Sequence, residues 1–159
     1  MNTGYPESPV FAEVEPGDLR EKEELAALDG TIFGAGSASI WIMAPLIRCG
    51  KVYSLRLRQQ LIGVAEFFRS WLRKDCGFLL SFGIHPDFRG KGYGRWFLGK
   101  CLESLEKDGI RGVELTVAPD NRCALRLYED MGFHKIKELP DEYGRGEYRW
   151  LMRLGFPGA

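Results

Sequence analysis

The apolar and polar positions of the chain repeat with two periods, one typical of strands and one typical of helices. Alternating or continuous apolar runs predict seven strands, over residues 10–14, 52–57, 61–68, 77–84, 112–117, 133–139 and 147–154. Apolar residues at helical spacing predict helices over residues 19–28, 92–107 and 122–131, and Ser37 or Ser39 can cap a further short helix. This order predicts an α/β fold, with a mixed, mostly antiparallel twisted sheet and helices on both faces.

The strand over residues 77–84 leads into a glycine-rich turn and then into the helix over residues 92–107. Three glycines stand at alternate positions there: Gly90, Gly92 and Gly94. Three basic residues lie among or beside them: Arg89, Lys91 and Arg95. Because glycine lets an anion approach the main chain and a helix N-terminus carries partial positive charge, this arrangement predicts a cradle for a pyrophosphate.

The spacing excludes the two common nucleotide loops. A Walker A loop requires a glycine five residues before Gly90 and a serine or threonine after Lys91, and neither is present. A dinucleotide fingerprint that starts at Gly90 requires a third glycine where the chain has Arg95. Within the preceding strand, Gly83 predicts a bulge or a close backbone approach by a ligand.

Composition limits the remaining classes. With 159 residues, 45% of them apolar, we expect a single domain over residues 1–159, with residues 1–9 as a loose lead-in. A formal net charge of zero gives no reason to expect a nucleic-acid partner, and no apolar run is long enough to span a membrane. We therefore expect a cytoplasmic protein with no membrane partner. The dispersed cysteines and the two histidines predict reduced, mostly buried thiols and no metal site.

The loop Arg89-x-x-Gly92-x-Gly94, after a strand that ends at Ile84, resembles the coenzyme A pyrophosphate loop of the GNAT superfamily of N-acetyltransferases. A second motif of that superfamily runs from an asparagine through an alanine and a Leu-Tyr pair to a Gly-Phe pair. Here it falls at Asn121, Ala124, Leu127-Tyr128 and Gly132-Phe133. The resemblance covers residues 52–154 well and the first fifty residues only in outline.

The resemblance implies direct transfer of an acyl group, normally acetyl, from acetyl-CoA to an amine. The residues that it places at the cofactor are Phe82, Ile84, Arg89, Gly90, Lys91, Gly92, Tyr93, Gly94, Arg95, Asn121 and Tyr128. A backbone N–H near Ile84 is expected to stabilise the negative charge that develops on the thioester oxygen. Tyr128 matches the family tyrosine that protonates the departing thiolate, and Asn121 matches the residue that holds the pantetheine arm or an adjoining water.

The base that deprotonates the amine is left open by the resemblance. Histone-type members carry a glutamate where this chain has Phe78, and ribosomal-protein-type members carry one where it has Thr116. The candidates are Glu114, on the same strand face as Thr116, and Glu66, on the third strand, each acting directly or through water. His85, which precedes the cofactor loop, is a third alternative.

The sequence thus predicts an acetyl-CoA-dependent N-acetyltransferase whose acceptor is a primary amine on a small molecule or peptide. A homodimer is a further expectation, since it is common among similar proteins. A loop of Asp141, Glu142 and Tyr143 can draw a cationic amine to the site. The alternative function is an acyl-CoA-binding sensor or regulatory module without transferase activity, which the two missing family glutamates motivate.

Overall fold

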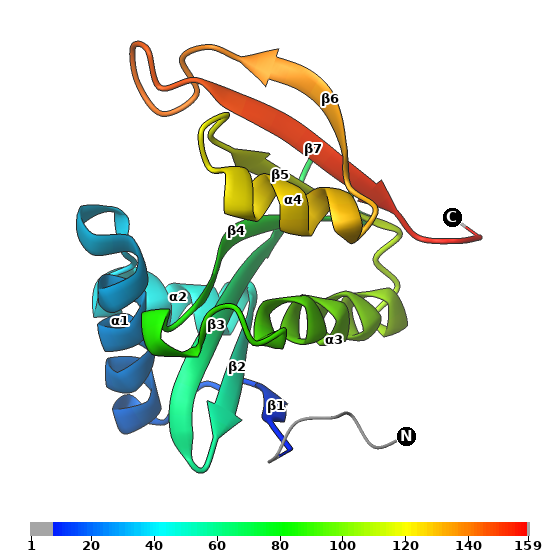
Figure 1. The fold of residues 1–159 in the computed structure, drawn as a ribbon. Helices are drawn as coiled ribbons and strands as arrows, with labels where there is room; N and C mark the ends of the chain where they lie inside the picture. The colour runs from blue at the N-terminus through cyan, green and yellow to red at the C-terminus, as the bar shows by residue number, and fades with distance from the viewer. Residues whose placement is uncertain (1–7, 159) are drawn as a thin grey trace. The chain divides into compact units, whose positions relative to one another are not determined.

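Seven strands form one mixed sheet in the order β1-β2-β3-β4-β5-β7-β6 in the computed structural model, which describes residues 8–158 (Figure 1). The strands are β1 (Val10–Glu13), β2 (Lys51–Leu57), β3 (Gln60–Arg69), β4 (Cys76–Ile84), β5 (Gly112–Val117), β6 (His134–Leu139) and β7 (Arg149–Gly155). The helices are α1 (Leu19–Phe33), α2 (Ile40–Cys49), α3 (Tyr93–Lys107) and α4 (Arg122–Asp130), with 3₁₀ turns η1 (Gly34–Gly36) and η2 (Pro86–Phe88). β4 and β5 run parallel, whereas β1–β2, β2–β3, β5–β7 and β6–β7 are antiparallel. The sheet is therefore mixed and mostly antiparallel, as predicted.

The chain divides into two compact units. The first holds the chain up to Phe68 and Ser81–Cys101, and therefore β1 to β3, α1, α2, the end of β4 and most of α3. The second holds Arg69–Leu80 and the chain from Leu102, with the start of β4, the end of α3, β5 to β7 and α4. Residues 1–7 of the expected lead-in lie outside the described range.

Helices cover both faces of the sheet in the first unit, as the sequence predicts. On one face α1 and α2 form an apolar core with β2 and β3; its buried members are Val14, Leu25, Leu28, Met43, Leu46, Ile47, Val52 and Val64. On the other face α3 contributes Phe97, whose ring centre lies 6.1 Å from that of Phe11 and 5.6 Å from that of Phe82. Successive strand residues point to opposite faces, so β3 supplies side chains to both layers.

The first helix is longer than predicted. α1 continues to Phe33 rather than ending at Leu28, and the N–H of Gly34 then bonds to Gly30 O to close its last turn. Ser39 is the N-cap residue of α2, as one of the two predicted caps, and this helix continues through Pro45. A helical proline leaves the carbonyl four residues earlier without a partner, and that residue is Trp41, which is 85% exposed. Water can solvate this carbonyl, which is why the helix tolerates the proline.

The second unit is built around β7, which lies between β5 and β6. α4 ends where Gly132, with a φ of +96°, turns the chain into β6. The ring of Tyr128 on α4 packs 5.7 Å from that of Phe133. A Cβ added at Gly132 would lie 3.2 Å from Leu154 Cδ1, so this turn also packs closely against β7.

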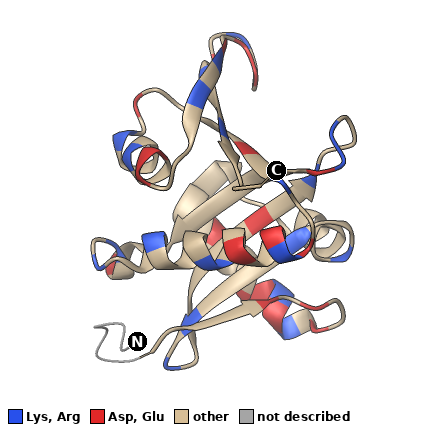
Figure 2. Cartoon of the chain, turned by 90° about the vertical axis from the view of Figure 1, so that its right-hand side faces the viewer, with Lys and Arg blue, Asp and Glu red and all other residues tan. Residues whose placement is uncertain are grey.

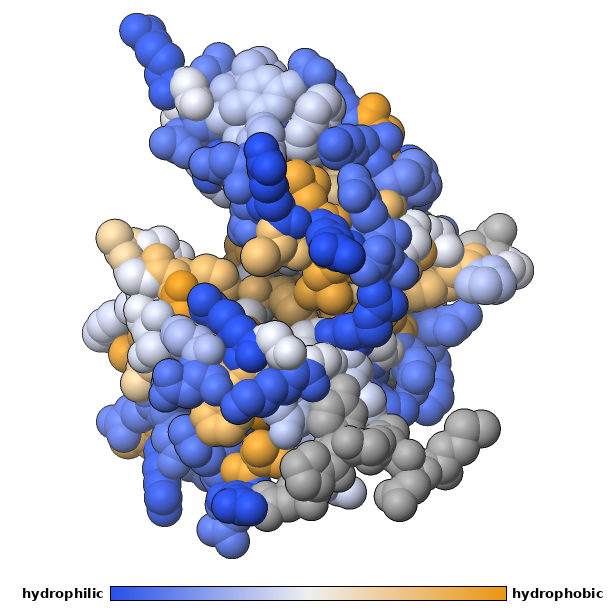
Figure 3. Space-filling view, viewed as in Figure 1, coloured by the Kyte–Doolittle hydropathy of each residue, from blue (hydrophilic) through white to orange (hydrophobic). Residues whose placement is uncertain are grey.

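Basic and acidic residues are interspersed along the described part of the chain (Figure 2). Apolar side chains reach the surface over α1 and α2, where Phe33, Trp41 and Ile42 are exposed (Figure 3). Within residues 8–158 no single helix has the length and apolarity of a membrane span, although α1 with η1 and α2, bent by 113°, pass that test together. No cluster of three metal-binding side chains occurs in the same residues.

The four cysteines are free. Cys76 and Cys101 are buried, as expected of structural thiols, whereas Cys49 and Cys123 are exposed.

Candidate active site

The turn between β4 and α3 has the backbone shape predicted for an anion cradle. Gly90 and Gly92 adopt φ values of +73° and +84°, a region that strains any residue with a side chain. α3 begins at the next residue, Tyr93, and the first N–H groups of a helix have no partner inside it. A Cβ added at Gly90 would meet no atom within 4 Å, so the space beside the turn is open.

Two basic side chains of this turn hold its own shape. Arg89 Nε donates to Ile84 O at 2.9 Å, which ties the turn to the end of β4. Lys91 Nζ donates to Asp87 O at 3.1 Å and lies 5.4 Å from the centre of the Phe88 ring. Both residues were predicted as cofactor contacts. Because each donates a hydrogen bond to the main chain of the turn, each also has a structural role.

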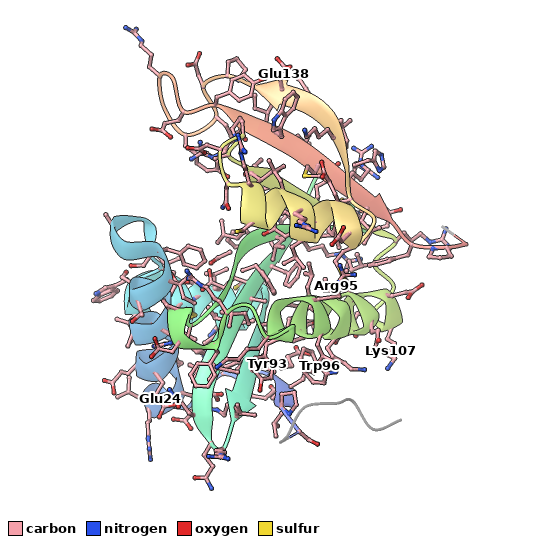
Figure 4. All side chains as sticks on the ribbon, viewed as in Figure 1. Glu24, Tyr93, Arg95, Trp96, Lys107 and Glu138 are labelled. Carbon is pink, nitrogen blue, oxygen red and sulfur yellow. The ribbon has the colours of Figure 1, made fainter. Side chains whose placement is uncertain are left out.

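The first turns of α3 separate polar and aromatic side chains. Arg95, two residues after Tyr93, lies on the opposite side of the helix from it, as expected at 3.6 residues per turn (Figure 4). Tyr93 is buried. Trp96 is half-buried, and the amine of Lys100 lies 5.9 Å from its ring centre.

The end of β4 carries Phe82, Gly83 and Ile84. Phe82 and Ile84 face the α3 layer, whereas Gly83 faces α1. A Cβ at Gly83 would lie 2.6 Å from Ile32 Cγ2, so a close approach by α1, rather than by a ligand, requires glycine here. The predicted close contact is thus real, but its partner is a helix of the protein itself.

His85 uses one ring nitrogen inside the turn. Its Nδ1 accepts a hydrogen bond from the N–H of Asp87 at 3.2 Å and so caps the 3₁₀ turn η2. Its backbone N–H donates to Ile62 O at 2.8 Å, continuing the pairing of β4 with β3. These contacts favour a structural role for this histidine over that of a base.

α4 places the second predicted motif in the other unit. Asn121 is the N-cap residue, and its Oδ1 accepts from the N–H of Ala124 at 3.2 Å. Tyr128 is 8% exposed, and burial raises the pKa of its hydroxyl to about 12. The phenol therefore keeps its proton through the physiological pH range, which suits a proton donor.

Glu66 is the less ordinary of the two predicted bases. It lies on β3 opposite Val52 of β2, is 0% exposed, and neither carboxylate oxygen has a hydrogen-bond partner among the described residues. Burial, together with the negative charge of Asp29, raises its pKa from 4.5 to about 8. A buried carboxyl without partners is costly for the fold, and groups of this kind are enriched at functional sites.

Asp29 is a residue that the sequence reasoning missed. It is 1% exposed, near the end of α1, and its two oxygens accept from the Ser81 hydroxyl at 3.3 Å and from the N–H of Ala38. Burial raises its pKa, and these two donors oppose that change. The signal in the sequence was a carboxylate four residues after Leu25, on the apolar stripe of the helix, beyond the expected helix end.

Glu114, the other predicted base, lies in an ion-pair network of the second unit. Arg153 donates to it through Nε at 2.8 Å and also through a second guanidinium nitrogen. Arg73 donates to the same oxygen at 3.0 Å. This carboxylate is therefore engaged in charge-assisted hydrogen bonds to two guanidinium groups, as expected of a structural ion pair.

The loop between β6 and β7 is folded against β5. The hydroxyls of Tyr143 and Thr116 share a hydrogen bond of 2.7 Å, and the guanidinium of Arg149 lies 5.1 Å from the Tyr143 ring centre. Asp141 Oδ1 accepts from the N–H of Gly146 at 2.7 Å. Beside this loop an open groove of ≈ 510 Å³ is lined by Ala118, Pro119, Asp120, Gly146, Glu147, Tyr148 and Arg149.

The predicted site residues fall into two groups. The loop residues from Arg89 to Arg95 lie in the first unit together with Phe82, Ile84 and Glu66. Asn121, Tyr128 and Glu114 lie in the second unit. The turn fits the pyrophosphate of coenzyme A, since it combines positive φ values, a helix N-terminus and open space at Gly90.

Comparisons with known proteins agree with this geometry. Residues 34–133 match the acetyltransferase (GNAT) family. The chain is 40% identical over 71 residues to an uncharacterized N-acetyltransferase of Methanocaldococcus jannaschii, which covers 45% of this chain and 29% of that protein. It is 32% identical over 72 residues to the [ribosomal protein bS18]-alanine N-acetyltransferase of Escherichia coli, which covers 45% of this chain and 49% of that protein. The matches thus span less than half the length of these curated relatives.

Solved structures show the same fold over nearly the whole chain. The ribosomal-protein-S18-alanine N-acetyltransferase of Escherichia coli superposes with a TM-score of 0.81 at 21% identity, covering 96% of both chains. A Bacillus subtilis acetyltransferase in complex with CoA superposes with a TM-score of 0.72 at 15% identity, covering 94% of this chain and 99% of that one. Since the family match spans more than half of the sequence and the fold agrees with it, the chain belongs to the GNAT acetyltransferase family.

Proposed function

We propose that the protein is an N-acetyltransferase that moves an acetyl group directly from acetyl-CoA to a primary amine of a small molecule or peptide. The turn between β4 and α3 carries this proposal, because Gly90 and Gly92 bring main-chain donors and a helix N-terminus to one open site. Family membership supports the same chemistry.

The cofactor supplies a thioester, which activates the acetyl group for attack by an amine. The N–H groups at the start of α3 would bind its pyrophosphate, and Arg95 would add a positive charge. The backbone N–H of Ile84 would stabilise the oxygen on which charge develops. Asn121 would hold the pantetheine arm.

Two side chains would move protons. Tyr128 would donate to the departing sulfur, and its buried phenol, with a pKa raised to about 12, is protonated at the pH of the reaction. Glu66 would accept the proton of the incoming ammonium group, directly or through water. Its pKa of about 8 supports this role, because a base is most effective when its pKa lies near the working pH.

Glu114 is the weaker candidate for the base. Its carboxylate is committed to Arg73 and Arg153, so taking up a proton would break charge-assisted hydrogen bonds to both. Glu66 has no such bonds to lose. We therefore assign the proton acceptor to Glu66.

The charges of the groove beside the β6–β7 loop indicate the chemical class of the acceptor. An ammonium group is attracted by carboxylates, and the groove beside the β6–β7 loop carries those of Asp120 and Glu147. Arg149, the basic residue among the described residues that line this groove, is paired with Glu147 at 3.3 Å. These charges favour a primary amine that is cationic before transfer.

The test is release of coenzyme A thiol from acetyl-CoA in the presence of a panel of amines, from polyamines and amino acids to peptides with free N-termini. Transfer to any of them, confirmed by an acetyl mass increment on the acceptor, supports the proposal. Acetyl-CoA binding by calorimetry without transfer across the panel would instead support the alternative, an acyl-CoA-binding regulatory module. A protein that binds no acetyl-CoA would contradict both functions.

A further inference from the structure

We propose that Asp29 is a positioning residue of the transfer site. Its buried carboxylate anchors the α1–α2 connection to β4 and lies in the same core layer as the carboxyl group of Glu66. This inference rests on the proposed function, in which Glu66 accepts the proton of the amine. Asp29 touches no reacting atom in this scheme. It acts through the neighbours that it fixes and through its charge.

The contacts of Asp29 join three segments that are distant in sequence. The Ser81 hydroxyl on β4 and the Ala38 N–H just before α2 both donate to the Asp29 carboxylate. Between Asp29 and Ala38 the chain passes through Gly34, whose φ is +59°. The last turn of α1 packs so closely on β4 that Gly83 has no room for a side chain beside Ile32. Asp29 therefore fixes this turn against the strand end that carries Ile84.

The two carboxyl groups differ in how their charges are stabilised. Asp29 has two donors, whereas neither oxygen of Glu66 has a hydrogen-bond partner among the described residues. Ionising two carboxyl groups in one buried layer is unfavourable, because like charges repel and both are desolvated, so one group retains its proton. That group is Glu66, whose pKa is raised to about 8 by burial and by the charge of Asp29.

Other elements that face Glu66 add no competing charge. α2 contributes Met43, Leu46 and Ile47 to this layer, and β2 contributes Val52. β4 contributes the uncharged Ser81. Asp29 on α1 is thus the charged group, among the described residues, that raises the pKa of Glu66.

This arrangement makes Glu66 a stronger base than an isolated carboxylate. An ammonium group gives up its proton more readily to an acceptor whose pKa approaches its own. The consequence is a rate that rises with pH as Glu66 loses its resting proton, with an apparent pKa near 8. Removal of the Asp29 charge should move that transition to lower pH.

The decisive variant is Asp29→Asn. The amide has nearly the shape of the carboxylate, and it can accept from Ala38 with its oxygen and donate to Ser81 with its nitrogen, so only the charge is lost. Asp29→Glu keeps the charge, and Ser81→Ala removes one hydrogen bond while leaving the charge in place. Thermal melting verifies that each variant is folded.

Two measurements are made on each full-length variant. The first is the titration of Glu66 by NMR of ¹³C-labelled glutamate side chains without substrate, with the signal assigned from Glu66→Gln. The second is the pH profile of kcat/KM for acetyl transfer. In Asp29→Asn we expect the Glu66 pKa from NMR and the apparent pKa of the kcat/KM profile each to fall by roughly one unit. In Ser81→Ala and Asp29→Glu we expect both pKa values to change less.

Unchanged transitions in a folded Asp29→Asn protein would overturn the proposal. If Asp29→Asn does not fold, the unmodified protein and Asp29→Glu still test the raised pKa of Glu66 on which the proposal depends, and a Glu66 titration near pH 4.5 in either protein would overturn it. A shifted NMR titration in a protein that transfers acetyl to no amine would confirm the effect of Asp29 on Glu66 and refute the proposed function instead.

Discussion

Arg153 on β7 and Glu114 on β5 are direct cross-strand partners, and the guanidinium donates twice to one carboxylate oxygen. Arg73 donates to the same oxygen from the segment before β4. The carboxylate thereby links three separate parts of the second unit. Its chemistry is that of a structural ion pair, although its position beside Thr116 made it a candidate base.

Replacement of Glu114 by glutamine is expected to affect stability rather than turnover. Loss of the charge weakens three charge-assisted hydrogen bonds, so the free energy of unfolding should fall by about 1–3 kcal/mol. Urea denaturation measures this change. Glu13→Gln is the matched control, because Glu13 is paired with Lys51 at the surface and its loss should change stability by less than about 1 kcal/mol. A large loss of kcat in a stable Glu114→Gln protein would return the role of base to Glu114.

The raised pKa of Glu66 predicts that the protein becomes less stable as the pH rises toward 8. Its pKa is raised from 4.5 to about 8 on folding, so the folded state binds the proton more tightly than the unfolded state. The free energy of unfolding should therefore fall as pH rises from about 4.5 to 8, by up to about 5 kcal/mol at about 1.4 kcal/mol per pH unit. Glu66→Gln should flatten this slope in denaturation curves taken across that pH range. An equal slope in both proteins would show that Glu66 does not carry this proton.

Tyr128→Phe tests the proposed proton donor. Phenylalanine keeps the packing of the ring against Phe133 and removes only the hydroxyl. We expect kcat to fall by roughly 10²-fold, the usual size of a lost general acid, with little change in acetyl-CoA affinity. Steady-state kinetics and calorimetry measure the two quantities separately. Unchanged turnover would remove Tyr128 from the mechanism.

Alanine substitutions at two glycines test whether the turn between β4 and α3 binds the pyrophosphate of acetyl-CoA. Gly90 and Gly109 have φ values of +73° and +83°, and an added Cβ would meet no atom within 4 Å at either position. Alanine therefore introduces similar backbone strain at both, about 1 kcal/mol. Only Gly90→Ala should also raise the acetyl-CoA KM, because only that turn precedes α3. Equal KM values in the two variants would argue against pyrophosphate binding at this turn.

Two substitutions of Arg89 compare the contributions of its hydrogen bond and of its charge to acetyl-CoA binding. Arg89→Ala should chiefly raise the acetyl-CoA KM, because the contact of Arg89 with Ile84 O that shapes the turn is lost. Arg89→Lys keeps the charge but lacks the guanidinium Nε, so it separates the two contributions. A fall in kcat with unchanged cofactor affinity would show that Arg89 acts at the chemical step.

Much of the fold was accessible from the sequence because its signals are local. The glycine turn, the cap at Asn121 and the end of α4 near Gly132 each depend on residues within a few positions of one another. The predicted strands leave three residues for the turn after β2, whereas the structure has two, Arg58 and Gln59, both with a positive φ that is not typical of either residue type. α1 is longer than predicted because packing, not propensity, decides whether Gly30 remains helical.

The sequence by itself determined the succession of strands along the chain, the family motifs and the glycine turn before α3, because these depend on periodicity and on residues close in sequence. Tertiary structure decided the properties of the carboxylates. Glu66 and Glu114 look alike as strand residues, yet one is buried without hydrogen-bond partners among the described residues and the other is held by two arginines from distant segments. Desolvation and charge neighbours arise only when α1, β3, β5 and β7 are packed, so no local pattern could distinguish them.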